Sequence, residues 1–397
     1  MKKILILDTG KEWGGGTNSL IELLKRADRH RYGFDALFYD NYKMGASTDI
    51  KTVLEGLGIS FSLMPRVRVG LAARALKGTV RPILSLAPAV KKRFLFSIEY
   101  SARILPASRR IAQTLKTGGY DLLYMNNQPS SNLEGILAAE AAGVASIQHS
   151  RVAVELNPVE AKAVNRVVKR VICVSKGVAE GLIGSGVDPK LCTVVYNGID
   201  PGVTPRRDKA QIRRTLGIKA GTKIIGTAGS LIKRKRVDLF IEALSRLKGS
   251  DVVGVIVGAG PEEGGLKALA AKRGVADKVI FTGFTPDAIS YINAMDVFVL
   301  PSGKEGLPRV ILEAMLMARP VVAFDVIGPS ELVEDKVTGF LLQDSGWERI
   351  AEAVDTLLAD TEMMVRMGQA GRHRVVESFS IDKYIKGVHG VFEEVLK

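Results

Sequence analysis

The sequence predicts an α/β protein made of two doubly wound domains that face each other across a cleft. Short apolar runs, rich in Val and Ile, alternate with helical patterns along the chain, which is typical of buried parallel strands joined by crossover helices. The runs form two groups, separated by the turn-rich stretch from Asn197 to Arg207. A length of 397 residues also fits two domains.

Each group of apolar runs is large enough for a complete sheet. The strands predicted before the turn-rich stretch are Ile4–Asp8, Phe34–Tyr39, Asp121–Asn126, Ala145–His149, Val171–Ser175 and Thr193–Tyr196. Those predicted after it are Lys223–Ala228, Val252–Gly258, Val279–Gly283, Val297–Leu300 and Val321–Phe324. Helical patterns close the chain at Ser345–Asp360, Thr361–His373 and Ile381–Leu396. We therefore place one domain at residues 1–200 and the other at residues 201–380.

The composition is that of an ordinary folded protein. Hydrophobic residues make up 46% of the chain and charged residues 25%, which excludes intrinsic disorder and collagen-like order. The apolar run Ile4–Leu7 stops at Asp8, too early for a signal peptide, and no run of about 18 uncharged apolar residues could span a membrane. The two cysteines, Cys173 and Cys192, lack partners at metal-ligand spacing. We therefore expect a cytoplasmic protein without a disulfide framework.

One basic segment departs from this average composition. Between Pro65 and Lys116 the chain has twelve basic residues and one acidic residue, and this segment carries most of the formal net charge of +14. Apolar residues are interleaved with the charges, as in helices that lie on anionic lipid. We expect this segment, with Lys91, Lys92 and Arg93, to contact an anionic membrane surface or an anionic acceptor. The alternative is a set of amphipathic helices with solvated basic faces; nucleic acid is not expected, because no nucleic-acid motif accompanies the charge.

The most informative segment of the sequence is PSGKEGLPRVILEAM, residues 301–315. A predicted strand leads into a loop with Glu305 and Gly306, and Pro308 suits the first turn of a following helix. The unpaired amides and the partial positive charge at a helix start favour an anion such as phosphate. Glu313 lies about 7 Å further along the helix. The two carboxylates thus bracket an anion site, as needed to bind hydroxyl groups on either side of a diphosphate.

Glu313 lies in a helix that is apolar on nearly every side. A buried carboxylate is costly unless it is paired or bound to a ligand. An ion pair with Arg309, four residues earlier, is the alternative, but such a pair contributes only a few tenths of a kcal/mol on an exposed helix. The pattern therefore favours a ligand-binding role for Glu313.

The segment closely resembles the donor site of family 4 glycosyltransferases, which are retaining enzymes of the GT-B fold with two facing Rossmann-like domains. The resemblance extends over nearly the whole chain. Other matches are GGG at 14–16, YNGID at 196–200, GSL at 229–231 with Lys235, GAGPE at 258–262, RPVVA at 319–323 and ELV at 331–333. Their order and spacing around the long central motif identify the family.

The resemblance implies a role for each matched position in the second domain. Glu313 is expected to bind the ribose of the donor nucleotide and Glu305 the hydroxyls of the transferred sugar. Lys235 is expected to neutralise the diphosphate. Other residues expected to lie along the donor are Gly229, Ser230, Phe284, Thr285, Gly306, Leu307 and Pro308. A solvated basic run is the alternative for Lys235.

Two matched positions in the first domain are also expected near the donor. Gly15 and Gly16 follow the first strand, and glycine there lets a turn approach the phosphates closely; a plain tight turn is the alternative. His149 ends a predicted strand where the family often has a histidine beside the reacting sugar, although a lone histidine is often only a structural hydrogen-bonding group. Glu305, His149 and Lys235 are therefore the expected catalytic residues.

Ser230 is the clearest departure from the family pattern, which has an arginine after the glycine. The resemblance implies that one phosphate contact must come from elsewhere, for which Arg234 and Arg236 are candidates. Arg151 and the turn Asn126–Gln128, at the carboxyl ends of their strands, are expected to line the cleft. The sequence has no Asp-x-Asp motif and no His/Cys cluster with ligand spacing, so neither a metal nor a cofactor is expected.

The predicted function is transfer of a hexose, with retention, from a UDP- or GDP-linked sugar to a glycan or lipid-linked glycan acceptor. The first domain is expected to bind the acceptor and the second the donor, with the helix at 381–397 packing back on the first. The basic segment indicates a peripheral position on the inner face of the cytoplasmic membrane.

Alternative functions are a GT-B enzyme with a soluble acceptor, a sugar-nucleotide epimerase, and a non-catalytic scaffold that binds glycans or nucleotides. An oxidoreductase is disfavoured, because the dinucleotide-binding fingerprint is absent.

Overall fold

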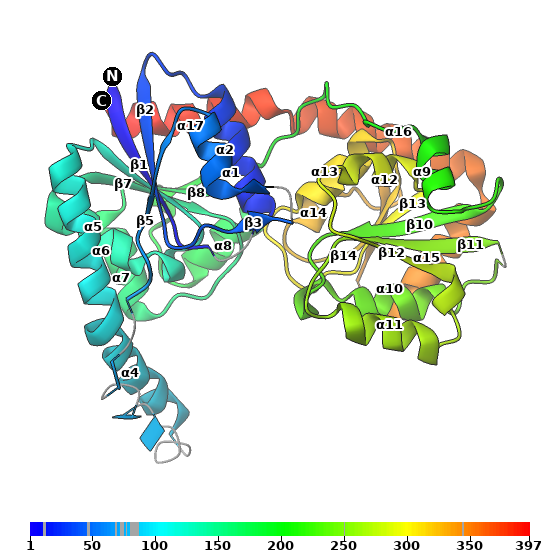
Figure 1. The fold of residues 1–397 in the computed structure, drawn as a ribbon, viewed down its shortest axis with the longest axis horizontal. Helices are drawn as coiled ribbons and strands as arrows, with labels where there is room; N and C mark the ends of the chain where they lie inside the picture. Colours follow the sequence, from blue (N-terminus) through cyan, green and yellow to red (C-terminus); the bar gives the residue numbers. More distant parts are fainter. Residues whose placement is uncertain are drawn as a thin grey trace.

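The chain folds into two α/β domains that lie side by side (Figure 1). The structure, a computed structural model, describes residues 1–10, 13–45, 48–67, 70–71, 75–76, 78–79, 87–249, 251–343 and 345–397.

The first domain contains a parallel sheet of order β5-β2-β1-β6-β7-β8-β9. Its strands are β1 (Lys2–Asp8), β2 (Tyr32–Phe38), β5 (Ser60–Leu63), β6 (Leu122–Asn126), β7 (Ala145–Ser150), β8 (Arg170–Cys173) and β9 (Cys192–Val194). In register, Ile4 of β1 lies between Phe34 of β2 and Leu122 of β6. A separate antiparallel pair consists of β3 (Lys43–Met44) and β4 (Thr48–Asp49).

Side chains of β1 alternate between two helical layers, because successive residues of a strand point to opposite faces. Ile4 and Ile6 belong to one core cluster, whose helices are α1 (Gly15–Arg26), α2 (Ile50–Gly56) and α17 (Ile381–Val395). Leu5 and Leu7 belong to the other cluster, whose helices in this domain are α5 (Leu105–Gly118), α6 (Leu133–Ala142), α7 (Pro158–Val167) and α8 (Lys176–Gly184). The first sheet is thus buried on both faces.

The second domain repeats this plan with a parallel sheet of order β12-β11-β10-β13-β14-β15. Its strands are β10 (Lys223–Ala228), β11 (Val252–Val257), β12 (Val279–Gly283), β13 (Val297–Leu300), β14 (Val321–Phe324) and β15 (Gly339–Leu342). Its helices are α9 (Lys209–Thr215), α10 (Val237–Leu244), α11 (Glu263–Lys272), α12 (Ala288–Ala294), α13 (Arg309–Leu316), α14 (Pro329–Leu332), α15 (Trp347–Ala359) and α16 (Thr361–Ser378).

Strand order reverses direction at two places, between β1 and β6 and between β10 and β13. In doubly wound sheets a crevice opens at the carboxyl ends of the strands where the order reverses. The segments that follow β1, β10 and β13 all line one cleft between the domains. The fold therefore places the ends of both sheets around a single site.

The chain passes between the domains twice, and the two passages are hydrogen-bonded to each other. The amide of Ile199 donates to the carbonyl of Phe379, and the amide of Ile381 donates to the carbonyl of Ile199, both at 2.9 Å. Gly198 packs so closely that a Cβ there would lie 2.6 Å from the carbonyl oxygen of Ser380. After this crossing, α17 packs against α1 and β8 of the first domain, and both termini lie close together (Figure 1).

The predicted strands are present, with ends that differ by at most two residues from those expected. Four strands, β3, β4, β5 and β15, were not predicted. The boundary proposed at residues 200 and 201 lies in the segment between β9 and α9. The middle helix of the closing three extends to Ser378 rather than ending at His373.

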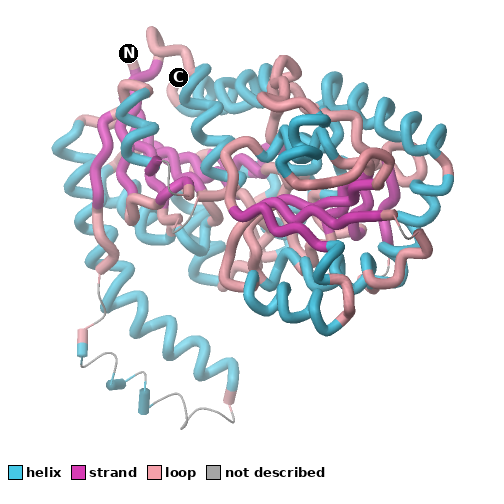
Figure 2. The backbone as a smooth tube through the Cα atoms, turned by 45° about the vertical axis from the view of Figure 1, so that its right-hand side comes forward, coloured by secondary structure: helices cyan, strands magenta, loops and turns pink. Residues whose placement is uncertain are grey.

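Helix α4 (Pro88–Glu99) extends away from the rest of the first domain, as both views show (Figures 1 and 2). It continues through a π-helical turn, Tyr100–Ile104, into α5. Val90 and Phe94 on α4 are 56% and 42% exposed. Lys92 and Arg93 are also exposed, and Lys91 is half-buried.

Several basic residues of the same segment lie outside the described part of the chain; they are Arg68, Arg74, Lys77 and Arg81. Among the helices that the structure describes, none has both the length and the apolar content needed to cross a membrane.

The substitution Gly198→Ala should destabilise the protein, because the added methyl group meets backbone atoms of residues 380 and 381 that cannot move independently. A loss of about 1–3 kcal/mol is expected from such overpacking. Gly390→Ala in α17 is the matched control, since a Cβ there meets nothing within 4 Å and alanine favours the helix. Thermal unfolding of both variants checks this; equal melting temperatures would show that the crossing is not tightly packed.

Candidate active site

A cleft of about 650 Å³ lies between the two domains, and residues of both line it. The residues that were expected along the donor are all among its lining residues: Gly15, Gly16, Gly229, Ser230, Lys235, Phe284, Thr285, Glu305, Gly306, Leu307, Pro308 and Glu313. The sequence pattern therefore identified a set of positions that the fold brings together from segments nearly 300 residues apart.

Two helices from opposite domains begin at this cleft. Helix α1 has Gly14 as its N-cap residue, and α13 has Pro308, so α13 begins one residue later than expected. In the described part of the chain, neither N-cap residue has a side chain that accepts from the first helical amides; at α1 the one side-chain contact is from the amide of Gly14 to Thr17 Oγ1, at 3.4 Å. The first amides of a helix carry a partial positive charge and need acceptors. The cleft thus presents unpaired backbone donors from both domains, a suitable environment for an anion.

Glu305 lies in the loop between β13 and α13 and is only 5% exposed. Its Oε1 is 2.6 Å from Lys235 Nζ, and its Oε2 is 3.2 Å from Arg234 Nη1. Burial tends to raise the pKa of Glu305, but the charges of Lys235 and Arg234 outweigh it, so that the pKa lies below its usual value. Glu305 is therefore ionised at neutral pH and holds two cations at the cleft.

Glu313 lies on α13, half-buried in the wall of the cleft. Among the described residues, none donates a hydrogen bond to its carboxylate, and none forms an ion pair with it. Burial raises the pKa of Glu313, and the nearby charge of Arg309 only partly opposes this effect. The side chain is thus an acceptor without a protein donor, as expected for a group that binds ligand hydroxyls.

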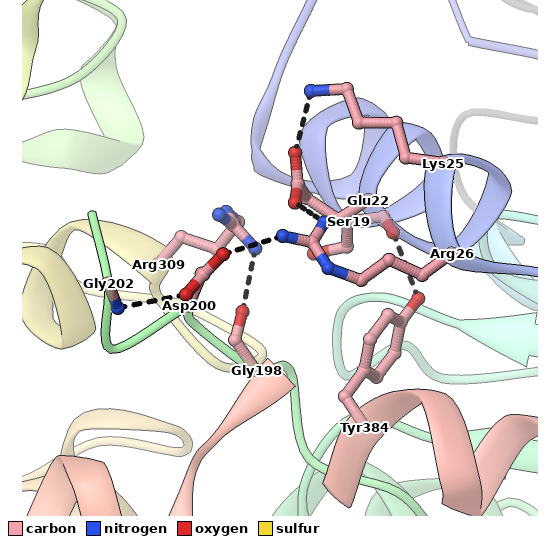
Figure 3. Close-up of polar contacts among 9 residues, drawn as sticks. All are labelled: Ser19, Glu22, Lys25, Arg26, Gly198, Asp200, Gly202, Arg309 and Tyr384. Atoms are coloured by element: carbon pink, nitrogen blue, oxygen red, sulfur yellow. Dashed lines mark hydrogen bonds and ion pairs between the residues drawn. The ribbon is translucent and has the colours of Figure 1, made fainter. Parts of the chain in front are cut away.

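Arg309 does not form the local ion pair with Glu313 that the sequence left open. Its Nη1 instead donates to the carbonyl oxygen of Gly198 at 3.0 Å (Figure 3). Its aliphatic part lies against the glycine turn of the first domain, because a Cβ on Gly15 would be 3.8 Å from Arg309 Cδ. Arg309 therefore lies where α13 and α1 meet the segment around Gly198, at which the chain passes from the first domain to the second.

The segment after β10 supplies a second wall. Gly229 has a φ of +145°, and the carbonyl of Gly229 lies 2.0 Å from where a Cβ on Gly258 would be, so both positions need glycine. Ser230 and Arg234 line the cleft. Arg236, the other candidate for the missing phosphate contact, is not among the lining residues and pairs with Asp238 at 3.3 Å.

Two of the contacts between the domains are close approaches at a glycine beside the cleft. A Cβ on Gly306 would lie 2.0 Å from the carbonyl oxygen of Arg151, and a Cβ on Gly45 would lie 2.4 Å from the ring of Phe284. Both glycines are thus required for contact between the domains. Arg151 lines the cleft as expected. Its Nε donates to Asn126 at 2.9 Å.

His149 does not reach the cleft, and the expectation that it lies beside the reacting sugar is corrected. The residue is fully buried in the first domain. Its Nδ1 is hydrogen-bonded to the hydroxyl of Tyr124, and its ring lies 6.3 Å from that of Tyr384 on α17. Burial, with the charge of Arg151, holds the pKa of His149 well below its usual value. His149 belongs to the contact between β7 and the returning helix.

The turn Asn126–Gln128 does not line the cleft either. The side-chain amides of Asn126 and Asn127 donate to the carboxylate of Asp8 at 2.7 and 2.9 Å. Burial raises the pKa of Asp8, although these amides, the amide of Gly10 and Arg151 oppose it. The asparagines thus connect the ends of β1 and β6, and Asn126 also accepts a hydrogen bond from Arg151.

Sequence reasoning missed Trp13 as a cleft residue. Its indole Nε1 donates to Asn18 at 2.7 Å, and its ring meets Tyr42 edge to face. Its position directly before Gly14–Gly16 could have indicated it. The described residues contain no group of three or more His, Cys, Asp or Glu side chains that could hold a metal ion.

Two doubly wound domains that face each other across a cleft are the architecture of the GT-B fold. The family model described as "Glycosyl transferases group 1" matches residues 208–374, and the model described as "Glycosyltransferase Family 4" matches residues 63–203. The chain belongs to the family 4 glycosyltransferases.

Curated relatives include enzymes of bacterial glycan synthesis. The lipopolysaccharide core biosynthesis glycosyltransferase LpsE of Rhizobium meliloti is 30% identical over 53% of this chain and 60% of its own length. The UDP-Gal:α-D-GlcNAc-diphosphoundecaprenol α-1,3-galactosyltransferase of Escherichia coli is 27% identical over 71% of this chain and 77% of its own. The chain spans between 49% and 61% of the length of four of the curated relatives, LpsE among them.

Among solved structures, HepE of Anabaena in complex with UDP and glucose is similar over 99% of this chain and 100% of its own, with a TM-score of 0.79 and 25% identity. The fold likeness therefore extends over both domains.

Replacing each of the two carboxylates of the cleft by neutral glutamine should have opposite effects on the stability of the protein. Glu313→Gln should leave the melting temperature at pH 7.5 unchanged or higher, because the ionised form is unfavourable in the folded state. This gain should shrink as the pH falls through the raised pKa of the folded state, and it should vanish below the pKa of the unfolded state, where Glu313 is protonated in both states. Glu305→Gln should cost about 3 kcal/mol at pH 7.5, because it removes the partner of Lys235.

The loss in Glu305→Gln should begin to shrink as the pH falls below the pKa of the unfolded state, and it should vanish below the lowered pKa of the folded state, where the wild-type carboxylate is protonated too. Thermal unfolding from pH 7.5 to about pH 3 measures both effects. A stability loss of the same size in Glu313→Gln would mean that Glu313 has a structural partner.

Proposed function

We propose that the chain transfers a hexose, with retention, from a nucleoside diphosphate sugar to a lipid-linked or lipopolysaccharide-type glycan at the inner face of the cytoplasmic membrane, without a metal ion. The observation that carries this proposal is the placement of Glu305 and Glu313 on either side of the uncapped start of α13. Two carboxylates in one cleft repel each other, but they can accept hydrogen bonds from a ligand that has hydroxyls at both ends and a diphosphate between them.

The two carboxylates, Lys235 and the two helix starts of the cleft each have a role in this reaction. Glu313 accepts hydrogen bonds from the ribose, and Glu305 accepts them from hydroxyls of the sugar. Lys235 and the amides at the starts of α1 and α13 stabilise the negative charge that develops on the departing diphosphate. The acceptor oxygen bonds to the anomeric carbon on the face that the diphosphate leaves, and the acceptor proton passes to the departing phosphate oxygen.

A uridine donor is the first to test. HepE, which matches this chain over nearly its whole length, was determined with UDP and also with UDP-glucose. Phe284 and Thr285, which were expected along the donor, line the cleft directly after β12, and we assign them to the end of the donor that carries the base. A hexose is favoured by the names of the galactosyl- and mannosyltransferases among the relatives.

A lipid-linked acceptor is favoured by α4 and by the relatives. The E. coli relative is named for a diphosphoundecaprenol acceptor, and two Rhizobium relatives are named for lipopolysaccharide core synthesis. The projecting α4 combines exposed Val90 and Phe94 with exposed Lys92 and Arg93. Apolar side chains among cations are what a helix needs to lie on anionic lipid.

Thermal unfolding with UDP, GDP, ADP and NAD tests the donor site. A ligand at 100 times its dissociation constant adds about 2.7 kcal/mol of stability, so UDP should raise the melting temperature by several degrees. Glu313→Gln, which should fold normally, should weaken that shift strongly. If no nucleoside diphosphate stabilises the wild type, or if NAD alone does, the transferase proposal is wrong.

Turnover identifies the acceptor class. Release of UDP from UDP-hexose should require a GlcNAc-diphosphoundecaprenol acceptor, and the anomeric configuration of the product, read by NMR, should be that of the donor. Turnover with a soluble sugar alone would instead favour an enzyme with a soluble acceptor.

Sedimentation with anionic liposomes tests membrane binding. Replacing Lys91, Lys92 and Arg93 by Gln should lower the affinity at least tenfold at low salt, because each cation near an anionic surface contributes about 1 kcal/mol. A charge-matched control replaces Lys219, Lys248 and Lys272, which are exposed in the second domain. Binding that is absent in the wild type, or lowered equally in both variants, would contradict a role of α4.

A further inference from the structure

The cations of the cleft differ in how many partners they already have. Lys235 and Arg234 are both bound to the carboxylate of Glu305. Arg151 is surrounded by neutral acceptors, with Nε on Asn126, Nη1 on Asn197 and Nη2 on Tyr384. These three side chains are thus largely satisfied before any ligand binds.

Arg309 is not satisfied in the same way. Its one hydrogen bond is from Nη1 to the carbonyl of Gly198, and its Nε is buried without a hydrogen-bond partner. Among the residues that the structure describes, no carboxylate lies within ion-pair distance of its guanidinium. Its positive charge is therefore not neutralised by a protein carboxylate, and the side chain lines the cleft where a ligand can pair with it.

The carboxylate of Asp200, two residues after Gly198, is already hydrogen-bonded through both of its oxygens. One carboxylate oxygen of Asp200 accepts from Arg26 at 2.7 Å, and the other accepts from the amide of Gly202 at 2.8 Å (Figure 3). Arg26 is also paired with Glu22. This network holds Asp200 against α1. Because both of its oxygens are bound, Asp200 does not neutralise the charge of Arg309.

Arg309 also lies in the right place for a phosphate. It is the first residue of α13, whose start is uncapped, and its aliphatic part contacts Gly15 at the uncapped start of α1. Its charge is therefore added to the partial charges of two helix starts. Because Glu305 offsets one of the two charges of Lys235 and Arg234, that wall offers about one net positive charge, less than a diphosphate carries.

We propose that Arg309 binds the diphosphate of the donor and supplies the cationic contact that Ser230 cannot make. This inference rests on the proposed function, since it needs a nucleoside diphosphate in the cleft. Arginine suits the role because its planar guanidinium donates two parallel hydrogen bonds to phosphate oxygens. It reaches the ligand from α13 rather than from the segment after β10.

Isothermal titration with UDP, and with GDP in parallel, tests this assignment. Arg309→Gln should weaken binding of UDP at least tenfold, because a charge-assisted bidentate contact is lost, and Arg309→Lys should weaken it less. Arg236→Gln, the same substitution just outside the cleft, should change the dissociation constant less than twofold. Melting temperatures of the ligand-free variants confirm that each is folded.

The decisive variant adds the missing cation at position 230. In the double variant Ser230→Arg with Arg309→Gln, most of the lost affinity should return, which an indirect effect through Glu313 or Gly198 would not allow. Unchanged affinity in Arg309→Gln, or loss without recovery in the double variant, would overturn the inference. Wild-type protein that binds neither UDP nor GDP would instead overturn the proposed function on which it rests.

Discussion

Close backbone contact between the domains is the constraint on which the rest of the structure depends. Gly306 lies against the carbonyl of Arg151, and Gly198 lies against residues 380 and 381. No side chain fits at either contact. Because of this proximity, the starts of α1 and α13 open into one cleft, and amides that belong to separate sheets can bind the same anion.

The charges of the cleft follow from that arrangement. Cations and unpaired donors that lie close together in a cleft repel one another. The buried carboxylate of Glu305 reduces this repulsion by pairing with Lys235 and Arg234. Glu313 and Arg309 have no such compensation within the described residues. Groups that reduce folding stability at a binding site are expected where function requires them. Both groups lie in the cleft, where a ligand can pair with them.

Strand positions and the composition of the donor motif could be predicted from the sequence, because buried parallel strands are apolar throughout and the motif is contiguous. Strand β5 escaped prediction because most of its residues are exposed at the sheet edge, and β15 because it is short and only partly buried. The sealed position of His149 depends on Tyr384, more than 200 residues away. The contact of Arg309 with Gly198 is equally non-local, whereas the sequence could suggest only the neighbour four residues along the helix.

Hydrogen–deuterium exchange with and without UDP tests the central claim most directly, namely that amides of both domains bind one diphosphate. The account predicts that UDP slows exchange in residues 13–18 at the start of α1 and also in residues 305–312 at the start of α13. Protection of the second segment alone would contradict a site shared between the domains, and protection of neither would contradict a donor site in this cleft.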